Sequence, residues 1–521
     1  MDLPDVVYLV AGFLGQNDQA RLAQASRFYC QLILPLAWRT VAGAAPLFKL
    51  LPGVIVENPG ALTGTEMIHL PRNLDNIGFT RFRFYAKFVK HLLLFKNPAV
   101  VTKINRWEEL LRYTKYNTLL PSLSSISLGT YWPQSISHYA WIAAFSSPSV
   151  RRIEIHPLVR RNLPTVSSKT ASAVFNLLIE RCPNIESFSI FVDHKQQTSP
   201  LETAFLSGNE HLKGNSGLLF GAIKHLRSLT CTSSMMEHRQ NTLLLLSRLP
   251  KLEILQIYAS QQDDIIIHTI PVIPPGSEAF SRLTNLTLYD FGPHATLSIL
   301  NCLVATAELT QLTLEINHRD KKYEDSHVDE FYNSMLIPTI CARAPHLTHL
   351  SIRPMWDSKS YVTIDNLSLE RLASLHLKSL TLAQSRAQVE QLAKLFPQIL
   401  TLRWPDQPVK LDQLGQFAAY HRLEHLSMKL DLSPSHNVKR LSDQAIPPAF
   451  PCVLESDYGN LTRLTQAETH EVLTDLARIW LRPLVLQQTA PFDYPHCDFA
   501  SNRRVEGLNK ELERIQQGTI V

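Results

Sequence analysis

The sequence places few side chains in the arrangements that enzymes use for chemistry. Its 20 histidines and seven cysteines are spread over 521 residues without the spacing of metal ligands, and the pair His496–Cys497 stands alone. The sequence contains no Gly-rich phosphate loop, no His-Glu-x-x-His and no Gly-x-Ser-x-Gly motif. We therefore expect a protein that is not an enzyme, with no catalytic residues, no bound metal and no cofactor.

Cysteine usage and hydropathy indicate where the protein works. The cysteines are odd in number and form no Cys-x-x-Cys pair, which is typical of reduced thiols in a cytoplasmic or nuclear protein. No stretch approaches the roughly 18–20 apolar residues that a membrane-spanning helix needs. A net charge of +5 is small for this length and does not demand nucleic acid. We expect neither a membrane nor a nucleic acid as partner.

One strongly basic stretch, residues 81–115, is a candidate binding region. It holds nine lysines and arginines against two glutamates, a local net charge of +7. Such a stretch could attract an acidic or phosphorylated segment of a partner. Alternatively, these charges are the solvated faces of two helices, with the interleaved aromatic residues packed in the core.

Apolar residues in the first 40 positions predict three short helices. Pro4 suits a first helical turn, and residues 6, 7, 10, 13 and 14 recur with helical spacing. Ser26 separates a second helix from a third, and Pro35 is expected to end the third. About 40 residues bury too little apolar surface to be stable alone, so these helices need a partner or an adjoining domain.

This segment resembles an F-box. The resemblance rests on the opening Leu3-Pro4, the apolar first helix, the run Leu-Ala-x-Ala-Ser-Arg-Phe-Tyr at 22–29 and the closing Leu-Pro-Leu-Ala-Trp-Arg at 34–39. It implies docking on the Skp-family adaptor of cullin–RING ubiquitin ligases. The alternative is a plain helical cap on a larger domain. The residues that the resemblance assigns to the adaptor interface are Leu3, Pro4, Val7, Leu14, Leu22, Ala25, Ser26, Phe28, Tyr29, Leu32, Pro35 and Trp38.

From residue 89 to residue 430 a triplet, apolar-x-x-apolar-x-apolar, returns twelve times at intervals of 22 to 41 residues. Its last two positions lie on one face of a short strand, and a helical segment ending near proline usually precedes it. The copies begin at Val89, Leu123, Val150, Ile185, Leu226, Leu252, Leu283, Leu309, Leu347, Leu377, Ile399 and Leu423.

Repetition of strand and helix predicts an α/β solenoid, with parallel strands on the concave side and helices on the convex side. The pattern resembles irregular leucine-rich repeats, and F-box followed by such repeats resembles a class of fungal F-box proteins. The Asn or Cys usual after each strand is mostly missing, which predicts irregular turns. The residues expected to line the concave face and to bind a protein substrate are Ser127, Glu154, Gln256, Thr287, Thr313, Ser351, Thr381 and Ser427.

These patterns divide the chain into an F-box (1–41), a connecting segment with an atypical first repeat (42–88), the array (89–430) and a degenerate last repeat (431–521). A strand at 38–41 and a helix at 47–51 are expected in the join, and a capping helix is expected from Val505 to Ile515. Residues 193–217 and 258–280 are expected to be long loops. The expected function is substrate recognition in a Skp–cullin–F-box ligase; the alternative is a repeat scaffold that recruits no ligase.

Overall fold

The computed structural model describes most of the chain in two compact units, Met1–Leu252 (the N-terminal unit) and Glu253–Val521 (the C-terminal unit). Most of the two expected long loops lies outside the described residues. The described residues are 3–57, 65–76, 78–95, 101–130, 135–157, 163–193, 223–237, 246–260, 280–303, 308–318, 326–355, 361–418, 422–431, 452–456, 465–480, 483–488 and 502–519.

Three helices open the N-terminal unit: α1 (Leu3–Phe13), α2 (Gln16–Ala25) and α3 (Arg27–Ala37). The Ser26 hydroxyl accepts a hydrogen bond from the Tyr29 backbone N–H at 3.1 Å and so caps α3. Pro35 does not end α3, contrary to the expectation from sequence. It sits in the last turn, where only one backbone hydrogen bond is lost, and the Trp38 N–H still reaches the Leu34 carbonyl.

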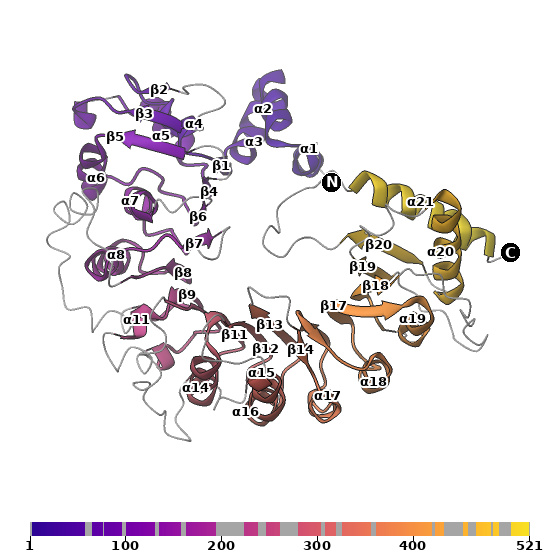
Figure 1. Cartoon of the computed structure of the whole chain (residues 1–521). Coiled ribbons are helices and arrows are strands. Elements are labelled where there is room, and N and C mark those ends of the chain that lie inside the picture. Colours follow the sequence, from indigo (N-terminus) through magenta and orange to yellow (C-terminus); the bar gives the residue numbers. More distant parts are fainter. Residues whose placement is uncertain are drawn as a thin grey trace. The chain divides into compact units, whose positions relative to one another are not determined.

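A parallel sheet follows these helices in the N-terminal unit (Figure 1). Its strands, in order, are β1 (Thr40–Ala42), β4 (His91–Leu94), β6 (Ser125–Thr130), β7 (Arg152–Pro157), β8 (Ser187–Ile190) and β9 (Ser228–Thr232). The helices that follow these strands are α4 (Ala45–Phe48), α5 (Thr80–Ala86), α6 (Trp107–Tyr116), α7 (Ser135–Phe145), α8 (Ser168–Arg181) and α11 (Ser234–Glu237).

The join between the first helices and the sheet differs from the sequence expectation. The first strand begins at Thr40 rather than at Trp38, because Trp38 closes α3 and its ring packs on Tyr85 at 4.5 Å. The following helix, α4, begins at Ala45 and ends at Phe48, whereas the sequence predicted a helix at residues 47–51. A small second sheet joins β2 (Ile55–Glu57), β3 (Thr65–His69) and β5 (Val101–Asn105), beside the 3₁₀ turn η1 (Leu74–Asn76).

The C-terminal unit repeats the same arrangement. Its parallel strands are β10 (Ile254–Tyr258), β11 (Asn285–Phe291), β12 (Gln311–Asn317), β13 (His349–Met355), β15 (Ser379–Leu382), β17 (Thr401–Lys410), β18 (His425–Asp431), β19 (Cys452–Ser456) and β20 (Leu484–Gln488). Its helices are α14 (Pro293–Leu303), α15 (Ser326–Glu330), the π-helical η4 (Phe331–Leu336), α16 (Ile337–Arg343), α17 (Asn366–Ala373), α18 (Val389–Leu395), α19 (Leu411–Ala418), α20 (Gln466–Ile479) and α21 (Asn502–Thr519). Strands β14 (Val362–Thr363) and β16 (Ser385–Arg386) pair separately.

The core confirms the predicted repeat. All three apolar positions of each of the twelve triplets are buried, and the neighbouring strands for which a register is given align triplet with triplet, as Leu286, Leu312 and Leu350 do. Within each unit the strands of the main parallel sheet lie on one side and the helices that follow them in the repeats lie on the other (Figure 1). No single strand–helix pair encloses these side chains, so each repeat is stabilised by its neighbours. The fold is an α/β solenoid.

Irregular turns, also expected, occur where strands end. Phe95, Asp290 and Gln384 adopt left-handed backbone conformations although none of them is glycine. Register shifts interrupt the pairing of β11 with β12 and of β17 with β18. The repeats therefore share a core pattern but not a common turn.

The predicted capping helix is α21, in which Val505, Leu508 and Leu512 are buried. The Asn509 side chain accepts a hydrogen bond from the Leu486 N–H at 2.7 Å and donates one to the Leu486 carbonyl at 3.0 Å. These bonds satisfy backbone groups of β20, the last strand, which would otherwise remain open to pairing with another chain.

Candidate protein-interaction surfaces

Helix α1 is apolar on two opposite faces. One face packs inside the three-helix module, where Val7 and Ala11 form a small core with Ala23 and Ile33. Each of these four side chains is at most 7% exposed. This packing fixes which way α1 turns its other residues.

The opposite face of α1 is exposed. Val6, Leu9, Val10 and Phe13 follow the spacing i, i+3, i+4, i+7 of one helical stripe, and the Phe13 side chain is 90% exposed. Phe28 of α3 is also exposed and contacts the Tyr29 ring edge-on at 5.6 Å. We call Val6, Leu9, Val10 and Phe13 the α1 stripe. Large apolar side chains gathered in water mark an interaction surface.

The residues that the sequence assigned to the adaptor interface differ in how exposed they are in the structure. Val7 is a correction, because it lies in the module core and faces away from solvent. Ala25, Ser26 and Phe28 are exposed, and the Leu3 side chain lies outside the described residues. The half-buried members are Pro4, Leu14, Leu22, Tyr29, Leu32, Pro35 and Trp38.

Sequence reasoning did not assign the α1 stripe to the interface. The signal was present: apolar residues on α1 occupy more than the single face that its own module covers. A helix that packs on one side only usually carries polar residues on its other side. A helix that is apolar on both sides therefore indicates two packing surfaces.

The second candidate surface is the strand face of the C-terminal unit that points away from the helices. One register row crosses all nine of its strands, so these positions lie side by side. The row consists of Gln256, Thr287, Thr313, Ser351, Thr381, Arg403, Ser427, Glu455 and Gln487. Six of these nine residues were predicted to line the concave face, and all six carry hydroxyl or amide side chains and are half-buried or buried: Gln256, Thr287, Thr313, Ser351, Thr381 and Ser427.

Two predicted contact residues in this row are not accessible. Ser427 is buried because Arg403 and Glu455, its neighbours on either side, join above it. The Arg403 guanidinium donates to both Glu455 carboxylate oxygens, at 2.8 and 3.0 Å. Thr287 is buried beside the longer side chain of Gln256. Outward direction on a strand did not ensure exposure, because longer neighbours cover short side chains.

The cover over Ser427 is a charged cluster. His425 Nε2 lies 2.7 Å from Glu455 Oε2. Burial raises the pKa of Glu455, but the hydrogen bond to His425 and the charge of Arg403 outweigh burial, and the pKa is lowered overall. A second pair, Arg353 with Glu315 at 3.2 Å, crosses β12 and β13. Both glutamates are nearly enclosed, so these pairs organise the face.

In the N-terminal unit the two predicted contact residues, Ser127 and Glu154, are neighbours in register and half-buried. The pKa of Glu154 is lowered, chiefly by a hydrogen bond with His156 and also by the charge of Arg152, although burial opposes the shift. Glu154 therefore remains ionised and places a negative charge on the strand face, two residues from Arg152.

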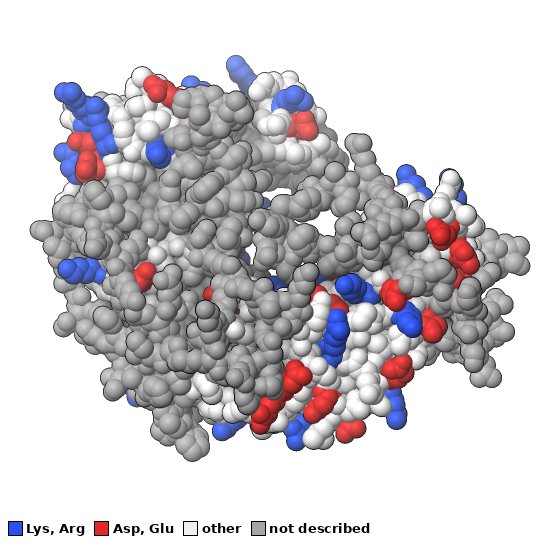
Figure 2. Space-filling model, in the orientation of Figure 1, with Lys and Arg blue, Asp and Glu red and all other residues white. Residues whose placement is uncertain are grey.

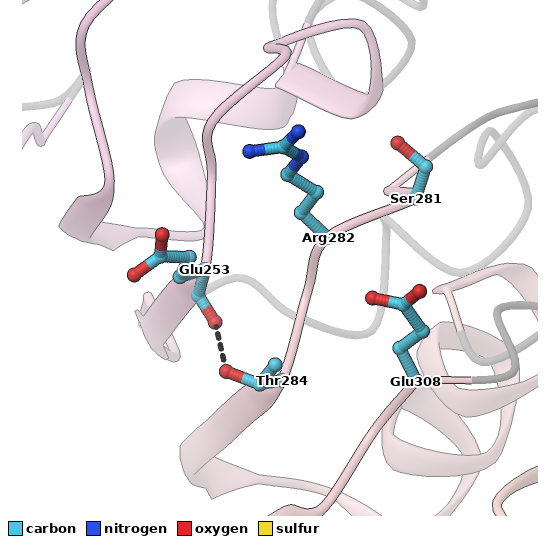
Figure 3. Close-up of a pocket in the computed structure, with 5 residues that line it drawn as sticks. All are labelled: Glu253, Ser281, Arg282, Thr284 and Glu308. Carbon is cyan, nitrogen blue, oxygen red and sulfur yellow. Dashed lines mark hydrogen bonds between the residues drawn. The ribbon is translucent and has the colours of Figure 1, made fainter.

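A shallow cavity of about 390 Å³ opens where β10 and β11 begin (Figure 3). Its lining is polar: Glu253, Ser281, Arg282, Thr284 and Glu308. The Thr284 hydroxyl donates to the Glu253 carbonyl at 3.2 Å, which ties two successive turns together. The sequence reasoning did not identify this cavity, since its residues come from turns that share no motif.

The described residues contain no cluster of His, Cys, Asp or Glu that could hold a metal ion, and no helix long and apolar enough to span a membrane. Burial raises the pKa of the Cys182 thiol to about 11 and that of Cys231 to about 12, so both thiols stay protonated and unreactive. On the face drawn in Figure 2, described cationic and anionic residues lie interspersed.

Comparisons with known proteins add little to the fold. No protein-family model and no curated protein matches the sequence. Among solved structures, the chain is similar to TLR13 in a complex with ssRNA13, at 12% identity over 71% of this chain with a TM-score of 0.28. It is also similar to the leucine-rich repeat ectodomain of the plant membrane receptor kinase GASSHO1/SCHENGEN3 from Arabidopsis thaliana, at 9% identity over 78% with a TM-score of 0.24. The chain covers 60% and 48% of those proteins.

Proposed function

We propose that this protein is a substrate-recognition subunit of a Skp–cullin–F-box ubiquitin ligase. In this proposal α1, α2 and α3 form the F-box that binds the Skp-family adaptor, and the repeat array binds a protein substrate. The observation that carries the proposal is the α1 stripe, because it is an apolar helix face left in water at the end of the chain that resembles an F-box.

The interface follows from what is exposed. The α1 stripe supplies the apolar centre, and Pro4 in the first turn helps to set where α1 begins. Fully burying a side chain such as leucine or phenylalanine contributes about 1.5–3 kcal/mol. Four half-exposed to fully exposed side chains are therefore enough to anchor a partner, with polar residues at the rim adding specificity.

The array fits a binding role rather than a catalytic one. Its strand face carries hydroxyl and amide side chains, two ion pairs with nearly enclosed glutamates and no candidate metal cluster among the described residues. In this proposal the partners are a Skp-family adaptor, a cullin–RING ligase that binds through the adaptor, and one protein substrate. Reduced cysteines and the adaptor itself favour the cytoplasm or nucleus as the place of action.

The test is direct binding of full-length protein to a purified Skp-family adaptor, followed by addition of a cullin. Replacing Leu3 and Pro4 together by alanine is expected to weaken adaptor binding, since the pair begins α1. A Leu9→Asp variant, which places a charge in the stripe, is expected to abolish it. If wild-type protein does not bind the adaptor, or both variants bind like wild type, the protein is a repeat scaffold that recruits no ligase.

A further inference from the structure

In the N-terminal unit, the residue before each strand of the main sheet is joined to the same residue of the next repeat. The bonds run from the backbone N–H of one residue to the carbonyl of the preceding one, at 2.7–2.9 Å. They connect Lys90 to Arg39, Ser124 to Lys90, Arg151 to Ser124, Glu186 to Arg151, and Arg227 to Glu186. The ladder fixes these six positions along one edge of the sheet, with neighbours separated by about 4.8 Å.

Four of the six positions on this edge are cationic and exposed: Arg39, Lys90, Arg151 and Arg227. Arg152, one residue further, is also exposed and is in register with Ser125 and Ser187. We call these five cations the basic edge. None of them occupies one of the three apolar positions of a repeat triplet, which are the positions that form the core.

The field of the basic edge acts on a neighbouring residue. His91 lies in register with Thr40 and Ser125, and its Nδ1 is 2.8 Å from the Ser125 hydroxyl. Burial lowers the pKa of His91, and the charges of Arg39, Lys90 and Arg152 lower it further. Three cations from three different repeats therefore converge on one point of the strand face.

Two carboxylates lie by the basic edge: Glu186, and Glu154, whose pKa the charge of Arg152 helps to lower. Within the ladder the single carboxylate is Glu186, which pairs with Arg151 at 3.3 Å. A row of hydroxyl residues in register runs next to the cations. A hydroxyl of this row can donate a hydrogen bond to an oxyanion, although in this structure the Ser187 hydroxyl donates to Glu154 at 3.4 Å and the Ser125 hydroxyl lies 2.8 Å from His91 Nδ1. The row is Thr40, Ser125, Ser187 and Ser228, with His91 and Arg152 between them.

We propose that the basic edge binds an acidic segment of the protein substrate, a step that rests on the proposed function. The edge from Arg39 to Arg227 spans five strand spacings, roughly 24 Å, which matches about seven residues of extended chain. Carboxylates or phosphates of such a segment would pair with the cations and accept hydrogen bonds from the hydroxyl row.

Protein is favoured over nucleic acid because Glu186 interrupts the cations and Glu154 lies on the adjacent strand face. A uniformly charged phosphate backbone would meet both carboxylates, whereas a peptide can place neutral residues opposite them. Recognition of single-stranded nucleic acid also uses exposed aromatic side chains for stacking. No aromatic residue belongs to the basic edge or to its hydroxyl row among the described residues.

The experiment measures fluorescence anisotropy of labelled 12-residue peptides with full-length protein. One peptide carries six glutamates, a second carries phosphoserines at the same positions, and a third carries glutamines; a 12-nucleotide single-stranded RNA is the fourth probe. The first two peptides are expected to bind, and their ratio distinguishes carboxylate from phosphate recognition. Binding is expected to weaken as salt rises from 50 to 500 mM, because screening lengths shorten.

The variant pair Lys90→Gln with Arg152→Gln is expected to weaken binding of the acidic peptides about three- to tenfold, from two exposed charge interactions. Its control, Lys115→Gln with Lys169→Gln, removes the same charge from exposed helical positions of the same unit and is expected to change nothing. Equal effects of both pairs, equal binding of the glutamine peptide, or tighter binding of the RNA would overturn the inference.

Adaptor binding distinguishes this inference from the proposed function. The Lys90 and Arg152 changes are expected to leave adaptor affinity unchanged, because neither residue lies in the three-helix module. Adaptor binding without binding of any acidic peptide removes only the inference about the substrate. Peptide binding without adaptor binding removes the ligase and keeps an acidic-peptide scaffold.

Discussion

Replacing Phe13 by alanine separates the role of the α1 stripe in binding from any role in folding. The Phe13 side chain is 90% exposed, so it contributes almost nothing to the core, and the free energy of unfolding is expected to change by less than about 0.5 kcal/mol. Full burial of a phenylalanine against a partner contributes about 1.5–3 kcal/mol. Since 1.4 kcal/mol is a factor of ten, the adaptor affinity is expected to fall about 10- to 150-fold.

The assay is isothermal titration of full-length protein with the Skp-family adaptor, alongside urea unfolding of each variant. Tyr116→Ala is the matched control, because this aromatic residue at the end of α6 is 80% exposed in the same unit. It is expected to change neither quantity. Val7→Ala, which truncates a side chain in the core of the three-helix module, is expected to lower the free energy of unfolding. Unchanged affinity of the Phe13 variant, with folding intact, would refute the assignment of the stripe to the adaptor.

Three further predictions concern the array, each checked by urea unfolding. Leu350→Ala is expected to cost about 2–5 kcal/mol by opening a cavity, and the adjacent Ser351→Ala less than about 0.5 kcal/mol; equal costs would contradict the strand register. Glu455→Gln is expected to cost about 1–3 kcal/mol at pH 7, because Arg403 loses its ionised partner. Since the folded pKa of Glu455 lies below its ordinary value of 4.5, this difference should persist down to that pH and disappear as pH falls through the folded pKa. Burial lowers the pKa of His318 from 6.5 to about 4, so on acidification this histidine is protonated in the unfolded chain before it is protonated in the folded protein. The free energy of unfolding of the wild type should therefore fall by about 2 kcal/mol more than that of His318→Gln between pH 7 and 4.5.

The sequence predicted the solenoid well because the repeat signal has a simple physical origin. Each strand must bury two alternate side chains, such as Leu286 and Leu288. The residue three positions before the first of them, here Leu283, lies in the preceding turn and is buried in the same core. A β-strand reverses its faces at every residue, so a single-residue slip would expose the whole set. Twelve copies of this constraint leave little freedom, even though the intervals between them vary.

The accessible surface was harder to predict, since it depends on neighbours that are distant in sequence. Ser427 points away from the helices, as expected, yet it is enclosed by an ion pair between residues 52 positions apart. Nothing local to Ser427 indicates this cover. The basic edge shows the converse: Arg39 and Arg227 are far apart in sequence, and only the hydrogen-bonded turns bring them into one row.

The orientation of α1 shows why composition alone did not assign its two faces. Both faces are apolar, so periodicity allows either one to pack inward. The inward face carries the small residue Ala11, which lies in the same buried cluster as the equally small Ala23, and small residues let helices approach closely. Bulky Leu9 and Phe13 would hold the helices apart, so they turn outward. Helix α1 thus leaves Leu9 and Phe13 on its exposed face, and in the proposed function the substitutions that matter for adaptor binding are those that cost the free protein least.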